Sequence, residues 1–177
     1  MPGPLFLEGD VVTLHPVEQA DLEFLETCVN HPSVREFVTA RRPKTSKDER
    51  QWLETVAESD DEVLLVCADG DPVGNVGLHD VDTAFGTAEL GYYVHPDAWS
   101  NGYATDAVGQ VVGYAFAELR LHKVSARCFE HNDGSRRVLE KNGFQREGVL
   151  REEAFVDDEH VDMYRYGLLA EEWRASR

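Results

Sequence analysis

The sequence has few cysteines and no long apolar run, and both shortages exclude classes of protein. Its three cysteines, Cys28, Cys67 and Cys128, are widely separated and form no CxxC pair. They predict neither a disulfide framework nor a zinc site, and they indicate a reducing compartment. No apolar stretch approaches the roughly 18 residues that a membrane span needs, and the first residues lack the basic start and apolar stretch of a signal peptide. We therefore expect a cytoplasmic protein that binds no metal and no membrane.

Basic residues are scarce too. The chain has 34 acidic residues against 17 basic ones, few of them lysine, and its formal net charge is -17 at pH 7. Such a charge argues against a nucleic-acid partner, because a phosphate backbone would be repelled. Runs of charge usually form a solvated face of a protein. We favour a sharper hypothesis, a halophilic protein in a salt-rich cytoplasm where screening removes the self-repulsion.

The remaining composition indicates a folded chain. Of its 177 residues, 42% are hydrophobic and 10% aromatic, and we expect one domain over residues 1–177. Apolar periodicity predicts an α/β (α+β) order of elements, β-α-α-α-β-β-β-α-β-α-β-β. The expected strands cover 11–15, 63–68, 73–81, 88–95, 123–129, 144–150 and 161–169. The main expected helices cover 18–29, 102–121 and 132–142, and a further helix follows a capping box at Ser46–Glu49.

The most informative segment is a strand, a loop and the start of a long helix, over residues 88–107. Gly102 and Ala104 stand where the loop enters the helix. Several backbone N–H groups can point at one anion there, and the helix dipole adds positive charge. This arrangement would bind a pyrophosphate without lysine. A glycine before a helix is weak evidence by itself, since it more often marks a simple turn.

The loop resembles the acyl-CoA-binding motif of the GNAT N-acetyltransferase superfamily, Arg/Gln-x-x-Gly-x-Gly/Ala, at Gly102 and Ala104. Trp99 departs from the first position of that motif and is similar instead to the branch with the RimJ and RimL ribosomal-protein N-terminal acetyltransferases. Residues 132–144 resemble that branch's Asn-x-x-Ser-x-Arg-Val-Leu-Glu-Lys-x-Gly-Phe motif, with Asn142 at its variable position. The opening 9–16 and the ending 162–169 fit it as well, so the resemblance covers nearly the whole chain.

The resemblance implies a GNAT fold, a mixed and mostly antiparallel sheet of about seven strands flanked by helices. Its fourth and fifth strands, 88–95 and 123–129, would splay apart so that the pantetheine arm of acetyl-CoA lies between them. The N–H of Val94, or of Tyr93 beside it, would polarise the thioester carbonyl. Asn132 would bind the pantetheine amide. The pyrophosphate would lie on the loop that follows Trp99, against Asn101, Gly102, Tyr103, Ala104 and Thr105.

Acetyl transfer to an amine needs a base, because an α-amine with a pKa of about 8 is largely protonated at neutral pH. Glu89 is the first candidate, acting directly or through a water, and it could equally be a cross-strand surface charge. His79 on the adjacent strand is the second, although a lone histidine there is more often structural. The choice between Glu89, His79 and an ordered water stays open.

The leaving thiolate needs a proton. Much of the superfamily uses a tyrosine near the end of the helix after the fifth strand, where this chain has Leu139. The resemblance therefore favours Ser135 as donor over a first-turn serine that only binds backbone.

The acceptor is expected to be a primary amine, and the branch resemblance favours a protein N-terminal α-amine, possibly of a ribosomal protein. Other proteins of this fold accept a polyamine, an amino acid or an aminoglycoside, so these remain alternatives. A different class, a catalytically silent acyl-CoA-binding regulatory domain, is opposed by the joint presence of Glu89, Asn132 and Ser135. The sequence leaves both a monomer and a homodimer open.

Overall fold

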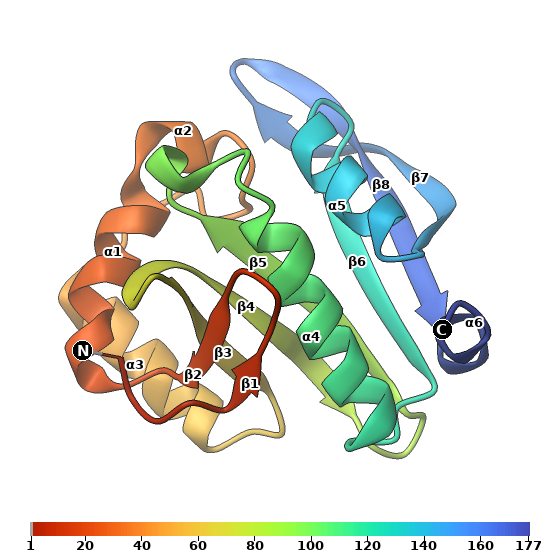
Figure 1. The fold of residues 1–177 in the computed structure, drawn as a ribbon. Coiled ribbons are helices and arrows are strands. Elements are labelled where there is room, and N and C mark those ends of the chain that lie inside the picture. Colours follow the sequence, from red (N-terminus) through yellow and green to blue (C-terminus); the bar gives the residue numbers. More distant parts are fainter. Residues whose placement is uncertain (1) are drawn as a thin grey trace.

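A computed structural model describes residues 2–177. Its centre is an eight-stranded sheet in the order β1-β2-β3-β4-β5-β6-β8-β7 (Figure 1). The neighbours are antiparallel except for β5 and β6, which run parallel. The strands are β1 (Leu7–Glu8), β2 (Thr13–Pro16), β3 (Glu62–Ala68), β4 (Asp71–Asp82), β5 (Thr87–Val94), β6 (Lys123–Phe129), β7 (Gln145–Val156) and β8 (Glu159–Leu169). The expected mixed, mostly antiparallel sheet is thus confirmed.

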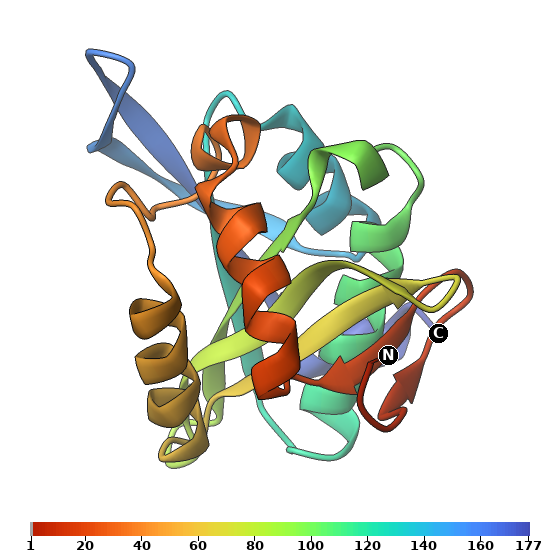
Figure 2. The ribbon, with the colours of Figure 1, turned by 90° about the vertical axis from the view of Figure 1, so that its left-hand side faces the viewer.

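Helices cover both faces of the sheet (Figures 1 and 2). On one face lie α1 (Leu22–Asn30) and α3 (Ser46–Ala57), joined through the short α2 (Pro32–Arg35). On the other lie α4 (Tyr103–Ala117) and α5 (Asp133–Lys141). Short 3-10 turns, η1 (Gln19–Asp21) and η2 (Pro96–Ala98), precede α1 and follow β5, and α6 (Ala170–Ala175) ends the chain.

The apolar face expected on the long helix forms the main core. It packs on the sheet through six buried residues of α4, namely Ala107, Val108, Val111, Val112, Ala115 and Phe116. A smaller cluster on the opposite face joins α1 to β3 through Leu22, Leu25, Leu65 and Cys67. The two clusters hold the helical layers against the sheet, because each buries apolar surface on one side of it.

Several details of the sequence prediction are wrong. The strand predicted over 144–150 continues to Val156 as β7, and a helix that was not predicted, α6, follows the last strand. The sheet has eight strands rather than seven, because the two-residue β1 is too short to show any periodicity. The cap of α3 is Thr45 rather than Ser46: the Thr45 N–H donates to Asp48 Oδ2 at 2.8 Å, and the Asp48 N–H donates to Thr45 Oγ1 at 3.3 Å. The helix after the loop ends at Ala117, four residues before the predicted 121.

The expected splay lies between β5 and β6. Their pairing runs from Thr87 with Lys123 to Leu90 with Ala126, and the described register continues no further. Beyond that point β5 stays paired with β4 as far as Val94, and β6 stays paired with β8 as far as Phe129. Each strand follows its outer neighbour, so the sheet opens between the carboxyl-terminal halves of β5 and β6.

The amino-terminal hairpin is tied to α4 by a carboxylate. Asp106 Oδ2 accepts the N–H groups of Val11 at 2.7 Å and Val12 at 3.0 Å, and a Cβ on Gly9 would collide with that carboxylate. We expect Asp106→Ala to lower the free energy of unfolding by about 1–2 kcal/mol, because two backbone donors lose a charged acceptor. Thermal unfolding should show a Tm lower by roughly 2–8 °C, whereas the exposed Asp10→Ala should leave the Tm unchanged. Equal Tm values for the two variants would contradict this account.

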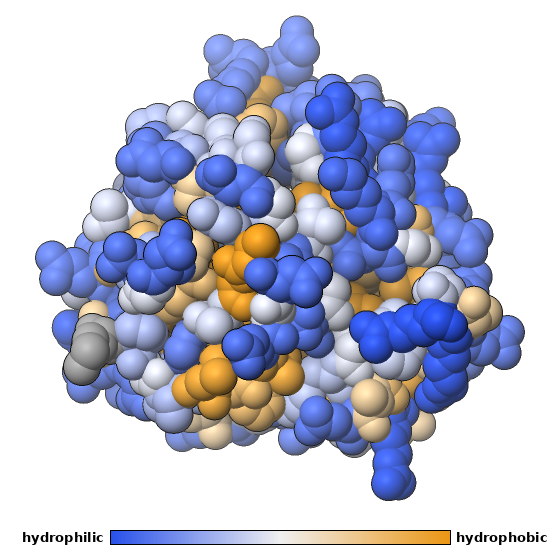
Figure 3. All heavy atoms as spheres, in the orientation of Figure 1, coloured by the Kyte–Doolittle hydropathy of each residue, from blue (hydrophilic) through white to orange (hydrophobic). Residues whose placement is uncertain are grey.

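The surface around α4 is largely hydrophilic, with a few apolar groups near its centre (Figure 3). Within residues 2–177 no helix is long and apolar enough to cross a membrane.

The net charge of -17 predicts that self-repulsion limits stability at low salt. We expect the Tm to rise with KCl well above ~0.15 M, beyond ordinary screening, if the surface is adapted to salt. A Tm that is flat or falls from low to molar KCl in thermal melts would reject the halophilic hypothesis.

Candidate active site

A cavity of about 540 Å³ lies where β5 and β6 part. One wall comes from α2 and the residues after it, including Val34 and Phe37. The end of β5 and the loop into α4 form the second wall, and one side of α5 along its whole length forms the third. The opening in the sheet is therefore lined by residues far apart in the sequence.

Most of the expected binding residues line this cavity. They are Tyr93, Val94, Trp99, Gly102, Tyr103, Ala104, Thr105, Asn132 and Ser135. Asn101, Glu89 and His79 do not line it. The structure thus brings the expected cofactor residues and the expected thiolate donor together, and it places both candidate bases outside the cavity wall.

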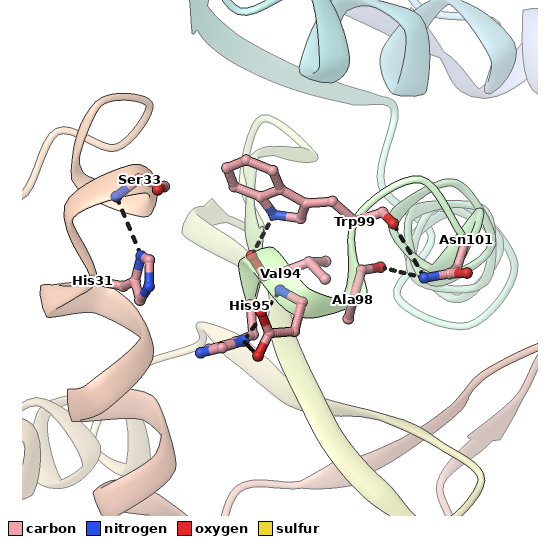
Figure 4. Close-up of polar contacts among 8 residues, drawn as sticks. His31, Ser33, Val94, His95, Ala98, Trp99 and Asn101 are labelled. Atoms are coloured by element: carbon pink, nitrogen blue, oxygen red, sulfur yellow. Dashed lines mark hydrogen bonds and ion pairs between the residues drawn. The ribbon is translucent and has the colours of Figure 1, made fainter.

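Side chains fix the shape of the loop before α4 (Figure 4). The Trp99 indole N–H donates to the Val94 carbonyl at 2.7 Å. Asn101 Nδ2 donates to the carbonyls of Ala98 and Trp99, both at 3.1 Å, so Asn101 supports the loop from outside the cavity. Gly102 caps α4 with a φ of 82°, a left-handed conformation that favours glycine. The first N–H groups of the 15-residue helix have no partner within the helix and are free to bind an anion.

The strand register distinguishes the amide of Val94 from that of Tyr93. The His95 N–H donates to the Val73 carbonyl at 2.8 Å, across the β4–β5 pair. In an antiparallel ladder, successive N–H groups point alternately toward and away from the partner strand. The Tyr93 N–H therefore points toward β4, and the Val94 N–H points toward the opening beside β6. Of the two amides expected to polarise the thioester, only Val94 faces the cavity.

The first turn of α5 holds the expected thiolate donor. Asn132 Oδ1 caps this helix by accepting the Ser135 N–H at 3.0 Å. The Ser135 hydroxyl lies 2.7 Å from the hydroxyl of Tyr92, which comes from β5 on the other side of the opening. Asn132 is thus a helix cap here, and its amide nitrogen donates to no acceptor among residues 2–177.

Glu89 and His79 lie directly opposite each other on β5 and β4. Glu89 Oε1 accepts from Arg127 Nε on β6 at 2.8 Å, so the cross-strand charge foreseen as its alternative role is present. His79 Nδ1 is 3.8 Å from Asp61 Oδ2, and its ring lies over Gly91, where an added Cβ would be 3.1 Å from the imidazole. His79 therefore has the surroundings of a packed, structural histidine.

The two faces of β5 separate the candidate base from the candidate donor. Successive strand residues point to opposite faces of the sheet. Tyr93 packs against the α1–α3 side and Tyr92 against the core on the α4–α5 side. Glu89 shares the face of Tyr93, whereas Ser135 lies on the face of Tyr92. Ser135 lies on the cavity wall, whereas Glu89 lies on the other face, in the paired part of β5 just before the opening begins.

Sequence reasoning missed several cavity residues. Arg137 and Lys141 of α5 line it and are one helical turn apart, a spacing that could have indicated a basic stripe. Tyr92 could have been found from strand alternation beside Val94. Asn142, assigned to a variable motif position, donates to the Thr105 carbonyl at 3.1 Å and so fastens α5 to the first turn of α4. No local pattern predicts that contact.

The described residues contain no group of three or more His, Cys, Asp or Glu side chains that could hold a metal ion. Cys28, Cys67 and Cys128 are buried and unpaired within residues 2–177. Burial raises the pKa of the Cys128 thiol to about 11, partly offset by the nearby Arg136 guanidinium and Ser135 hydroxyl. Cys128 is thus a thiol that keeps its proton at neutral pH, close to Ser135.

The opening, the loop before α4 and the first turn of α5 lie together as the sequence resemblance predicts, and comparison with known sequences shows the family. Residues 12–145 match the family described as Acetyltransferase (GNAT) domain. Because the match covers most of the chain, the protein belongs to the GNAT acetyltransferases. It is an acetyl-CoA-dependent N-acetyltransferase whose acceptor is an amine.

The names of individual relatives differ in the acceptor that they give. The chain is 27% identical to the uncharacterized N-acetyltransferase YoaA of Bacillus subtilis, over 92% of this chain and 96% of that one. It is 35% identical to the putative ribosomal N-acetyltransferase YdaF of the same organism, over 62% of this chain and 60% of that one. It is 27% identical to the spermidine N(1)-acetyltransferase of Vibrio cholerae, over 89% and 92% of the two chains.

Solved structures show the same fold. A structure described as a probable acetyltransferase has a TM-score of 0.81 at 27% identity, covering 93% of this chain and 96% of the other. The spermidine N-acetyltransferase of Vibrio cholerae in complex with CoA and spermine has a TM-score of 0.87 at 22% identity, covering 92% and 98%. The GNAT fold expected from the sequence is confirmed.

Proposed function

We propose that the protein, acting as a single domain over residues 1–177, acetylates a protein N-terminal α-amine in the manner of the RimJ/RimL branch. The motif at residues 132–144 and the similarity to a putative ribosomal N-acetyltransferase support this acceptor. A polyamine is the second candidate, because a spermidine acetyltransferase matches the chain along most of its length. The observation that carries the reaction itself is the Val94 N–H facing the opening between β5 and β6, with Ser135 on the wall of that opening.

The cavity fits the acyl donor. Its volume of about 540 Å³ and its position where β5 and β6 part suit a pantetheine arm, whose amide would meet Asn132. The free amides from Gly102 to Thr105 would bind the pyrophosphate, and Arg137 and Lys141 would add positive charge on the facing wall. These cations matter in a chain of net charge -17, since they offset the repulsion that a multiply charged nucleotide meets.

In the proposed mechanism, groups of the protein act at three atoms of the substrates: the thioester oxygen, the acceptor nitrogen and the thioester sulfur. The Val94 N–H donates to the thioester oxygen, where negative charge develops. Glu89 removes a proton from the acceptor ammonium, directly or through a water, and the freed nitrogen lone pair forms a bond to the thioester carbon. The nitrogen then loses its second proton to solvent. Glu89 Oε1 is bound to Arg127, and no hydrogen bond to its Oε2 is recorded within residues 2–177, so that oxygen is available.

Ser135 acts at the sulfur. As the carbon–sulfur bond breaks, its electron pair stays on sulfur and sulfur takes the Ser135 hydroxyl proton. Ser135 regains a proton from solvent in the open cavity, and Glu89 returns to solvent the proton taken from the amine. For an ammonium acceptor the sum is one acetylated amine, one thiol and one proton released to solvent, with no change in the protein.

The placement of the pyrophosphate predicts an effect of charge at Gly102. Because nothing lies within 4 Å of a Cβ built there, Gly102→Gln and Gly102→Glu should carry the same backbone strain. Glu adds a negative charge beside the phosphates, so acetyl-CoA should bind on the order of 10- to 100-fold more weakly to Gly102→Glu than to Gly102→Gln. Calorimetry with both variants measures the ratio. Equal dissociation constants would refute the placement.

The acceptor is tested by incubating the protein with radiolabelled acetyl-CoA and a panel of N-terminal peptides, spermidine, amino acids and aminoglycosides. Mass analysis then shows which compound is labelled. We expect labelled peptides, and the same peptides with blocked N-termini should stay unlabelled. Labelled spermidine instead would favour the polyamine alternative. Tight acetyl-CoA binding without release of free thiol, with any amine, would indicate a silent binding domain.

A further inference from the structure

The cavity wall holds a tyrosine that the proposed mechanism does not use. The hydroxyl of Tyr92 on β5 lies 2.7 Å from Ser135 Oγ and 3.3 Å from the Ser135 carbonyl oxygen. The two residues are 43 positions apart in the sequence and belong to opposite walls of the opening. Tyr92 therefore bridges the cavity beside the hydroxyl that is proposed to act on sulfur.

Each of the two hydroxyl groups has one proton, so the short contact uses one and leaves the other free. The Ser135 carbonyl lies inside α5, where the helix ladder already supplies it with a donor, and it is the more distant acceptor. Ser135 Oγ is the closer one. With the phenol donating to Ser135 Oγ, the proton of Ser135 points away from Tyr92, either into the cavity or toward the neighbouring sulfur of Cys128.

The surroundings of Tyr92 keep this arrangement in place. The ring packs against the main core beneath α4, which fixes the position of the hydroxyl. Burial raises the pKa of Tyr92, and the hydrogen bond with Ser135 offsets only part of that rise. The phenol therefore keeps its proton across the working range of pH and remains a hydrogen-bond donor.

We propose that Tyr92 is a positioning residue, which donates a hydrogen bond to Ser135 Oγ and thereby directs the Ser135 proton toward the thioester sulfur. The proposal rests on the proposed role of Ser135. Tyr92 transfers no proton itself, so the proton balance of the reaction is unchanged. Its contribution is to hold the serine hydroxyl proton in one orientation, because that proton otherwise rotates freely about the C–O bond.

The test is the kinetics of Tyr92→Phe. We expect kcat to fall about 10-fold, the size of one oriented hydrogen bond, with the KM for acetyl-CoA within about twofold of the wild type. Tyr166→Phe is the matched control, because the Tyr166 hydroxyl donates to Glu140 Oε1 of the same helix at 3.1 Å and lies outside the cavity wall. It should leave kcat unchanged.

A double-mutant cycle separates positioning from packing. In a Ser135→Ala background, Tyr92→Phe should cause no further loss of kcat, because the hydroxyl that it orients is absent. A wild-type kcat for Tyr92→Phe, or losses that multiply in the double variant, would overturn the proposal while leaving Ser135 as donor. A wild-type kcat for Ser135→Ala would overturn both roles together.

Discussion

Replacing Glu89 by Gln should slow acetyl transfer by about 10²- to 10⁴-fold at neutral pH, the range for one positioned base. At that pH an α-amine acceptor with a pKa of about 8 is mostly protonated, and the variant lacks the group that removes the proton. As the pH rises past roughly 8, neutral amine becomes abundant and part of the lost rate should return. Profiles of kcat/KM against pH on one amine acceptor measure both effects.

Loss of the ion pair with Arg127 is a second consequence of Glu89→Gln and needs its own control. Arg127→Gln breaks the same 2.8 Å contact and keeps the carboxylate. Both side chains are partly exposed, so the pair contributes little by itself, of order 0–1 kcal/mol, and Arg127→Gln should retain most of the activity. If the Glu89→Gln and wild-type profiles differ only by a constant factor, Glu89 is not the base, and His79→Gln becomes the next variant to examine.

Replacing Ser135 by Ala should also lower kcat by about 10²- to 10⁴-fold, with acetyl-CoA binding nearly unchanged. The hydroxyl acts on sulfur mainly in the transition state, so its removal affects kcat more than affinity. Unlike the Glu89 variant, Ser135→Ala should show no recovery at high pH, since free amine does not protonate a thiolate. A large rise in the dissociation constant of acetyl-CoA, with kcat retained, would show that Ser135 only caps or binds.

Local sequence patterns were sufficient for much of the fold and for one half of the site. The apolar stripe of α4 and the turn at Gly102 are each determined by residues close together in the chain. The loop at Gly102 and the first turn of α5 from Asn132 to Ser135 are local in the same sense, which explains why motifs identify these segments, although the motif did not predict that Asn132 caps α5. The capping box of α3 was placed one residue late because Thr45 and Ser46 are both good caps.

The other half of the site depends on contacts that no local pattern encodes. The ion pair of Glu89 with Arg127 joins residues 38 positions apart, and the Tyr92–Ser135 contact joins residues 43 apart. Both depend on the parallel pairing of β5 with β6 ending after Leu90, which is set by packing across the whole sheet. The register of β5 with β4 also shows that the Val94 N–H faces the opening and the Tyr93 N–H does not, a choice that the sequence left undecided.

A structure of the protein bound to CoA is the most direct test of the central claim, that the opening between β5 and β6 holds the acyl donor for attack. The account predicts the pyrophosphate within hydrogen-bonding distance of the amides at the start of α4, and the sulfur beside Ser135 Oγ and Tyr92. The Val94 N–H should face the position of the thioester oxygen. Glu89 should lie on the face of the sheet opposite to the one that carries Ser135. CoA bound with its sulfur away from Ser135, or its phosphates away from Gly102, would contradict the account.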